Sequence, residues 1–419
     1  MPLRFDVDTL PRRLAEAGYC TQLIHDTPHL INSGHNFDWP FHAWTFIRGA
    51  EVDRPWINDS KLGFPENWRL NPLFDFVDEG VLQGRRNYVI INYSRSNRKR
   101  KHHEDWNAAK LFLTASEWLK DNASRDNFFL WIDCFDPHEP WDVPPEFAVV
   151  YDKEPDYDGR IDPRCFAVHD LTRVPHDRVE RVREHIKALY AAKVSWVDHW
   201  LGTFLDTLAR TELIKNTAII LTADHGTNVG ERNQFGKRFP VREQEGHIPL
   251  FIHVPGYGSG RSSVFVQPQD LFATILGIAG VEPAEELDSN NVLELASKRV
   301  KCSDGPRRIA LSGRPAHAWN ENPELPQLTV FGFDYYLELA AKPAACSLTR
   351  YGSLENVASS QKLVLEEMRE AAIDELKRWG TSSDLLKWLC NNGETGFPKI
   401  ESPKPPGFDF YWKRLYNKW

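Results

Sequence analysis

The chain has 419 residues, of which 26% are charged and 41% are hydrophobic, a composition ordinary for a globular protein with a large core. Its net charge of −8 argues against a protein that binds nucleic acid through overall positive charge. The sequence holds neither an apolar leader nor a run of about 18 apolar residues, so we expect a cytoplasmic protein without a membrane span.

The first predicted element is a helix that begins near Thr9 and ends at Gly18, followed by a strand over 19–24. These two elements form half of an α/β repeat. Such a strand needs an earlier strand beside it, and none precedes it, so we expect a central strand to be missing. The next stretch, 25–42, is irregular and contains four histidines, His25, His29, His35 and His42. Four histidines directly after a strand fit a functional site and a solvated loop equally well.

A basic run over 94–103 follows a short apolar run at 88–93. One interpretation is a patch that binds phosphate or nucleic acid. The other is a solvated loop before the next helix, which the acidic net charge and the lack of interleaved aromatic residues favour. Apolar residues at helical spacing then predict a helix over 105–120.

A buried strand is predicted over 128–134, and it runs directly into the turn Phe135–Trp141. His138 stands in this turn between two X–Pro units, and the fixed φ angles of proline hold it stiffly. The histidine could simply stabilise a turn. The alternative, a general acid or anion ligand at the carboxyl edge of a sheet, is favoured because a similar arrangement recurs later in the chain.

That second arrangement follows a long helical pattern over 176–210, which is interrupted near Gly202. A buried strand over 218–221 comes next and releases Asp224 and His225 at its carboxyl end, where α/β folds place their sites. Lys237 follows shortly after. A carboxylate, an imidazole and a cation in one segment suit an anionic substrate handled with a metal ion.

The rest of the chain divides into two parts. A strand over 249–254 and a helix over 269–279 complete a first domain, for which we predict the bounds 1–282. After it come short strands near 308–311 and 327–339, an amphipathic helix over 362–379 and a tail over 391–419. These indicate a smaller C-terminal subdomain, 283–419, with an antiparallel sheet and a tail that wraps the surface.

Four segments together resemble the sulfatase family of the alkaline-phosphatase-like superfamily. They are the first helix with the beginning of its strand (Thr9–Tyr19), the strand and turn that contain His138 (Phe128–Trp141), the long helix with the Asp-His pair (Leu189–Gly226), and the segment that contains Lys237 (Gly236–Gly256). The resemblance implies an α/β fold: a mixed sheet flanked by helices, with a smaller antiparallel subdomain. It also implies a metal-dependent sulfuric-ester hydrolase that acts on a small-molecule or carbohydrate sulfate ester.

The resemblance also implies roles for individual residues. Asp224 and His225 would be metal ligands, and Lys237 would hold the sulfate and steady the leaving oxygen. His138 would help to protonate the leaving group, and His29 would match a further family histidine, although Thr27 stands where the family has lysine. The family metal is Ca²⁺ in the first instance. Many sulfatases have asparagine at the position of His225. The imidazole of histidine is a softer ligand than the amide oxygen of asparagine, so Mn²⁺ or Zn²⁺ is also possible.

One family feature is absent from the sequence. The family nucleophile is a formylglycine made from the cysteine or serine of a C/S-x-P-x-R box, and these 419 residues contain no such box. We therefore expect an N-terminally incomplete catalytic domain with weak or absent turnover. Two alternatives stay open: a phosphodiesterase or phosphonate monoester hydrolase of the same superfamily, and a degenerate, non-catalytic binding protein.

Overall fold

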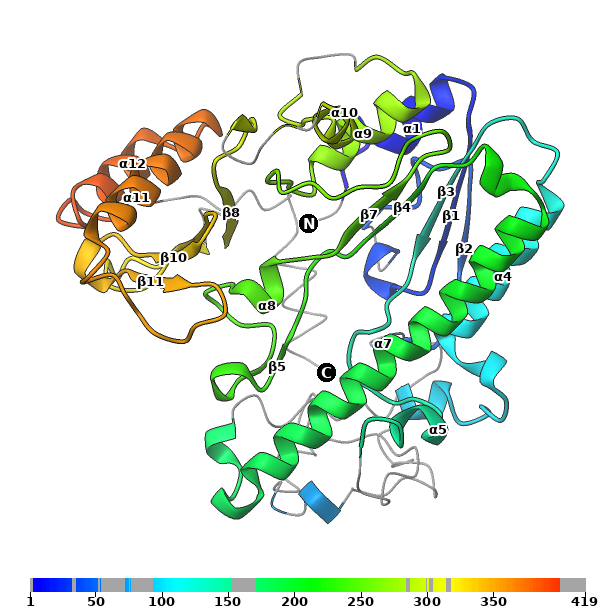
Figure 1. The fold of residues 1–419 in the computed structure, drawn as a ribbon, viewed down its shortest axis with the longest axis horizontal. Coiled ribbons are helices and arrows are strands. Elements are labelled where there is room, and N and C mark those ends of the chain that lie inside the picture. Colours follow the sequence, from blue (N-terminus) through cyan, green and yellow to red (C-terminus); the bar gives the residue numbers. More distant parts are fainter. Residues whose placement is uncertain are drawn as a thin grey trace.

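The computed structural model describes residues 3–31, 35–51, 53, 72–74, 76, 93–152, 171–283, 287–298, 300, 304–313 and 318–399. The predicted apolar run at 88–93 and the tail from 400 onwards lie almost entirely outside these residues. In the described part, no helix combines the length and apolar character that a membrane crossing requires. Figure 1 shows a large α/β body and a C-terminal lobe beside it.

A parallel three-stranded sheet forms the centre of the α/β body. Its order is β2 (Ala43–Phe46), β1 (Cys20–His25) and β3 (Phe128–Asp133). Helix α1 (Leu10–Glu16) precedes β1 and ends at Gly18, whose φ of +91° suits glycine. We predicted that a central strand beside the strand after α1 would be missing. Later segments of the chain supply a partner on each side of β1, and the missing strand stays a prediction.

A second, two-stranded sheet pairs β4 (Ile219–Thr222) with β7 (Leu250–His253) in antiparallel fashion, so the strands of the body are mixed in direction. We predicted that the strand before Asp224 would be buried. Instead Leu221 is 42% exposed, and its neighbour Phe251 is 65% exposed. Among the described residues β4 pairs with β7 alone, and each of the two strands carries an exposed apolar side chain.

Two helices, α4 (Asn107–Asp121) and α7 (Val179–Arg210), pack together across the parallel sheet and bury the main core (Figure 1). We predicted an interruption near Gly202, but α7 is continuous through it. Glycine costs about 1 kcal/mol in a helix. Burial of Trp200 and Phe204 on either side contributes about 1.5–3 kcal/mol each and outweighs that cost.

A further helical cover lies at one end of the body. Helix α9 (Asp270–Ala279) packs against α1 through Leu10, Leu14 and Leu276, and α10 (Val292–Ser297) follows it. Figure 1 places these three helices together above the strands. A buried ion pair between Arg307 and Asp270 fixes the chain that leaves this cover.

The C-terminal lobe has its own antiparallel sheet and its own core, as the sequence predicts. The sheet order is β11 (Ser347–Arg350), β10 (Tyr335–Leu339), β9 (Leu328–Phe331) and β8 (Ala310–Gly313). Helix α11 (Lys362–Arg378) packs on this sheet with α12 (Ser383–Cys390), a helix that the sequence pattern did not predict. The 3-10 turns of the described residues are Pro28–Leu30, Pro72–Phe74, His103–Asp105, Leu171–Arg173, His176–Arg178, Leu213–Lys215, Glu231–Asn233 and Pro343–Ala345.

Candidate active site

The turn that carries His138 is anchored at the carboxyl ends of β1 and β3. The backbone N–H of Phe135 donates to the carboxylate of Asp26, a buried residue directly after β1, over 2.6 Å. Within the turn, His138 N donates to the carbonyl of Phe135 over 2.9 Å, and Trp141 Nε1 donates to the carbonyl of Pro137 over 3.0 Å. These bonds give the imidazole a fixed position, as the flanking prolines predict.

Lys237 reaches the same place from a short hairpin of β5 (Asn228–Val229) and β6 (Phe235–Gly236). Gly236 has a φ of +71°, which only glycine adopts without strain, and its carbonyl accepts a hydrogen bond from Asn228 Nδ2 over 2.9 Å. On the other side of the lysine, Arg238 N donates to the carboxylate of Glu245 in α8 (Glu243–Gly246) over 2.6 Å. Both flanks of Lys237 are therefore held by the backbone.

His138, Lys237 and two carboxylates form one cluster, which we call the His–Lys centre. Lys237 Nζ lies 2.9 Å from His138 Nε2 and 2.6 Å from Glu139 Oε2. The other ring nitrogen, Nδ1, lies 3.1 Å from Glu51 Oε2 and 3.2 Å from Glu139 Oε2, with the carbonyl of Glu139 at 2.7 Å. With three oxygen acceptors around it, Nδ1 carries a proton and donates, which leaves Nε2 to face Lys237.

The charges of the centre set its protonation. Burial lowers the pKa of the His138 imidazole, but the hydrogen bond with Glu51 and the negative charge of Glu139 outweigh burial and hold this pKa above its ordinary value. Burial raises the pKa of Glu139, yet the positive charges of His138 and Lys237 outweigh it and hold this pKa below its ordinary value. The surroundings therefore favour the protonated form of His138 and the ionised form of Glu139 more than water does.

His29, the third predicted catalytic residue, lies near the centre but one ring away. Its imidazole centroid is 5.9 Å from the ring of Phe135, and that ring stacks on His138 at 4.2 Å. Burial, followed by the positive charge of His138, lowers the pKa of His29. His29 is thus neutral over more of the pH range than His138, and the two histidines are suited to different protonation states.

The other histidines of the 25–42 stretch have structural partners. His25 is fully buried at the end of β1, with Nδ1 3.1 Å from the carbonyl of Thr27. His42 Nδ1 accepts the backbone N–H of Thr21 over 3.2 Å. Of the four histidines, His29 is therefore the member that approaches the His–Lys centre through an aromatic contact.

Glu51 and Glu139 are members of the centre that the sequence analysis did not predict. Glu139 is next to His138 in the chain, so its position in the same turn was a signal that could have found it. Glu51 lies 87 residues before His138 in an aromatic-rich stretch without a motif, and the fold alone brings it close.

Asp224 and His225 lie at the carboxyl end of β4 as predicted, but they point into solvent. Their side chains are 87% and 44% exposed. Asp224 Oδ1 accepts the backbone N–H of His225 over 2.8 Å, and His225 Nδ1 donates to the carbonyl of Gly226 over 2.8 Å. Across the described residues, no three side chains of His, Cys, Asp or Glu come together as a metal site would require. Among the described residues, Asp224 and His225 therefore lie together without a third side chain of these types.

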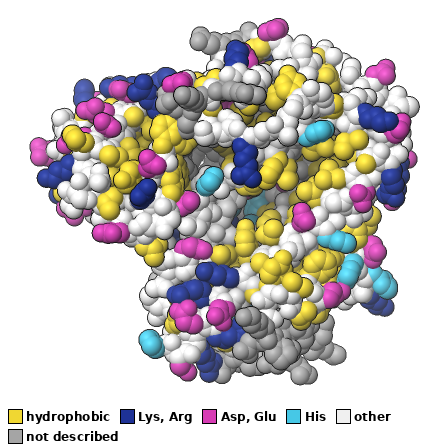
Figure 2. All heavy atoms as spheres, in the orientation of Figure 1, with side chains coloured by type: hydrophobic (Ala, Val, Ile, Leu, Met, Phe, Trp, Pro, Cys, Tyr) yellow, Lys and Arg dark blue, Asp and Glu magenta, His cyan; other side chains and the backbone are white. Residues whose placement is uncertain are grey.

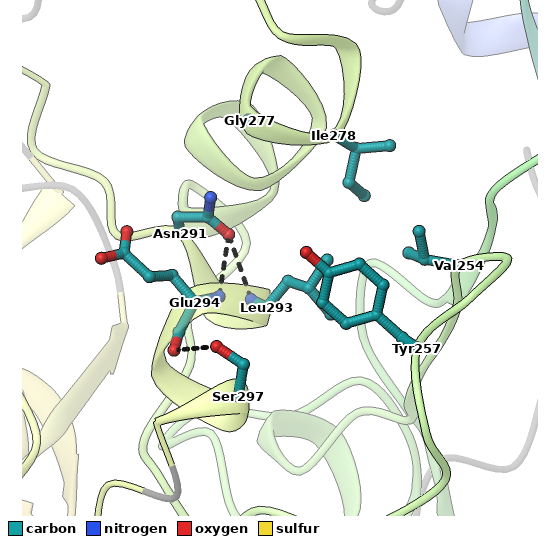
Figure 3. Close-up of a pocket in the computed structure, with 8 residues that line it drawn as sticks. All are labelled: Val254, Tyr257, Gly277, Ile278, Asn291, Leu293, Glu294 and Ser297. Carbon is teal, nitrogen blue, oxygen red and sulfur yellow. Dashed lines mark hydrogen bonds between the residues drawn. The ribbon is translucent and has the colours of Figure 1, made fainter.

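The surface is hollowed where the C-terminal lobe meets the body, with histidine and Lys or Arg side chains at the margin of the recess (Figure 2). A separate cavity of about 240 Å³ lies beside α9 and α10. Figure 3 shows Asn291 at this cavity, with its side-chain oxygen already accepting the N–H groups of Leu293 and Glu294. None of the residues lining this cavity belongs to the His–Lys centre, so the cavity is not part of the predicted site.

Sulfatases are among the known proteins that the chain resembles. The family described as Sulfatase matches residues 2–281. A protein described as a sulfatase, from Formosa agariphila, is 27% identical over 219 residues, which cover 49% of this chain and 43% of the relative. A choline-sulfatase from Rhizobium meliloti is 29% identical over 192 residues, which cover 42% of this chain and 36% of the relative.

Solved structures show the same fold. A phosphonate monoester hydrolase of Agrobacterium radiobacter has a TM-score of 0.58 at 17% identity, with 90% of this chain and 81% of that chain covered. At this identity the likeness concerns the fold alone. The matched segments span less than half of the two curated relatives' own lengths.

Proposed function

Because the chain belongs to the sulfatase family, we propose that its His–Lys centre is the leaving-group half of a sulfuric-ester hydrolase site. The substrate is a sulfate ester of a small molecule or carbohydrate. The observation that carries the proposal is the 2.9 Å approach of Lys237 Nζ to His138 Nε2, with the ionised Glu139 carboxylate beside them. Each of these two nitrogens can donate a hydrogen bond to an oxygen of a sulfate group that binds between them.

The centre divides the chemistry between its lysine and its histidine. Lys237 donates hydrogen bonds to the sulfate oxygens, which gain negative charge as the S–O bond to the leaving group lengthens. His138 gives its Nε2 proton to the oxygen that departs, so the alcohol leaves neutral. Glu51 and Glu139 keep the imidazole protonated until that step. Together these groups lower the barrier to departure of the alcohol.

The attacking group and the metal are not assigned to described residues. The family nucleophile is formylglycine, and this sequence has no C/S-x-P-x-R box, so we expect weak or absent turnover from the 419-residue chain. A bound divalent cation would polarise the ester oxygens. Asp224 and His225 alone do not fit such a cation, because the described residues offer no third ligand beside them. Calcium, manganese and zinc titrations of wild type and D224N are expected to show weak binding in every case.

The proposal is tested by binding and by turnover. We expect inorganic sulfate and 4-nitrophenyl sulfate to perturb the imidazole signals of His138 in NMR spectra, and the perturbation to disappear in H138Q. Absence of any sulfate effect at His138 would overturn the proposed site. A clear aryl-sulfatase rate from the purified chain would overturn the expectation of weak turnover.

The main alternative is a phosphodiesterase or phosphonate monoester hydrolase. His225, where many sulfatases have asparagine, suits this branch as well as the sulfatases that carry the same variant. The test compares 4-nitrophenyl phenylphosphonate and bis(4-nitrophenyl) phosphate with 4-nitrophenyl sulfate, each in the presence of the same metals. Tighter binding or faster hydrolysis of either phosphorus ester would support this alternative. The third possibility is a non-catalytic binding protein, which would bind sulfate esters at His138 and turn over none of these esters under any metal condition.

A further inference from the structure

A buried lysine lies beneath the turn that carries His138. Lys193 comes from the middle of α7, and its side chain is 1% exposed. Its Nζ donates to Asp136 Oδ1 over 3.0 Å and to the carbonyl of Asp142 over 3.0 Å, with Asp142 Oδ1 at 3.5 Å. A buried ammonium is costly to desolvate, so its three oxygen neighbours make it a specific feature of this interior.

Asp142 is held from a second direction. Arg100 NH1 donates to Asp142 Oδ2 over 2.7 Å, and the Tyr93 hydroxyl donates to Asp142 Oδ1 over 2.6 Å. Burial alone would raise the pKa of Asp142, but the positive charges of Lys193 and Arg100 outweigh it and keep this carboxylate ionised. Arg100 belongs to the basic run at 94–103, so at this residue the run is an internal support and not a solvated loop.

The two aspartates bracket the catalytic turn. Asp136 stands two residues before His138, and Asp142 stands four residues after it. One ammonium group on a rigid helix therefore joins both ends of the turn. We propose that Lys193, with Asp142 as its partner, is a positioning residue that holds the His138 imidazole against Glu51 and Glu139.

This proposal rests on the proposed function only for the use made of His138, because the positioning itself can be measured without turnover. If Lys193 acted through its charge alone, its removal would raise the pKa of His138, since a nearby positive charge disfavours a second one. If it positions the turn, its removal loosens the contacts with Glu51 and Glu139, and the pKa falls. The two explanations predict shifts of opposite sign.

The experiment is an NMR pH titration of His138 in the full chain, with its signal assigned by loss in H138Q. We expect K193M to lower the pKa of His138 by about 1, and K193R to restore most of the difference. The matched control is R307M, which removes the cation of the buried Arg307–Asp270 pair outside this turn. R307M is expected to lower the stability of the protein and to leave the pKa of His138 unchanged.

An unchanged or raised pKa of His138 in K193M would overturn the proposal. If K193M is too unstable to purify, the same titration on K193Q decides, because the amide also removes the positive charge but keeps a polar side chain that can donate a hydrogen bond. K193Q is expected to lower the pKa of His138, and an unchanged or raised value would overturn the proposal. Failure of sulfate to bind the wild-type chain would refute the proposed function while leaving the titration result intact.

Discussion

Single side chains decide which groups of the centre carry charge, and Lys237 is the residue that would meet the sulfate. We expect K237A to weaken sulfate binding by about 10-fold, the low end for a charge-assisted hydrogen bond, because its side chain is 36% exposed. Binding is measured by isothermal titration. K215A, which removes a lysine that is 68% exposed, is the control and should bind as wild type does. Equal affinities for wild type and K237A would contradict the assignment.

The contact between Glu51 and His138 predicts how the stability of the protein depends on pH. The folded pKa of His138 lies above the ordinary value of about 6.5. The native state thus binds this proton more tightly than the unfolded state does. The resulting stability is fully present below the unfolded pKa and is lost as pH rises through the folded pKa.

The substitution E51Q removes the hydrogen-bonded carboxylate that raises this pKa. We expect the free energy of unfolding of the wild type to fall more steeply than that of E51Q as pH rises above about 6.5. Urea unfolding of both proteins at a series of pH values measures this free energy. Parallel pH profiles for the two proteins would show that Glu51 does not hold the proton on His138.

At the scale of elements, two glycines provide a matched pair. A Cβ at Gly226, after β4, would lie 2.0 Å from the carbonyl oxygen of Gln244, so G226A must displace the Asp224–His225 loop from α8. We expect it to cost about 1–3 kcal/mol of stability. Gly202 in α7 has nothing within 4 Å of its Cβ position, so G202A should stabilise by about 0.5–1 kcal/mol. Chemical denaturation of both variants measures whether G226A lowers and G202A raises the free energy of unfolding.

The elements also show why exposure was mispredicted. The apolar residues of β4 predict a strand correctly, because strand propensity is a local property of the sequence. Whether Leu221 is covered depends on what lies beside β4 and on its faces, and neither is encoded within the strand. The same reason explains α7, where packing of distant core residues overrides the local cost of Gly202.

On the scale of the whole molecule, the C-terminal sheet holds the segment that carries Lys237. Arg242 and Glu338 form an ion pair of 2.7 Å with side chains 14% and 9% exposed. Arg232 also donates to the hydroxyl of Tyr336 over 2.8 Å. The lobe therefore does more than cover the body, since β10 supports both ends of the lysine segment.

We expect E338A to destabilise the protein by about 3 kcal/mol, because it leaves a largely buried arginine without its carboxylate. It should also weaken sulfate binding, since Lys237 lies between the two anchored residues. The exposed pair Lys342–Glu324 is the control, and E324A should change stability by less than about 0.5 kcal/mol. A loss of stability with unchanged sulfate affinity would separate the lobe from the site.

The sequence by itself determined the family, the α/β class and the two segments that bring His138 and Lys237, because each depends on a local pattern of strand, turn and motif. The predicted domain bounds, the metal ligands and the roles of the site residues remain predictions. Only the tertiary structure placed Glu51 at His138 and Lys193 beneath its turn, and only it left Asp224 in solvent. These contacts join residues 51–87 positions apart or depend on neighbouring strands. Packing between distant elements decides them, and no local pattern records it.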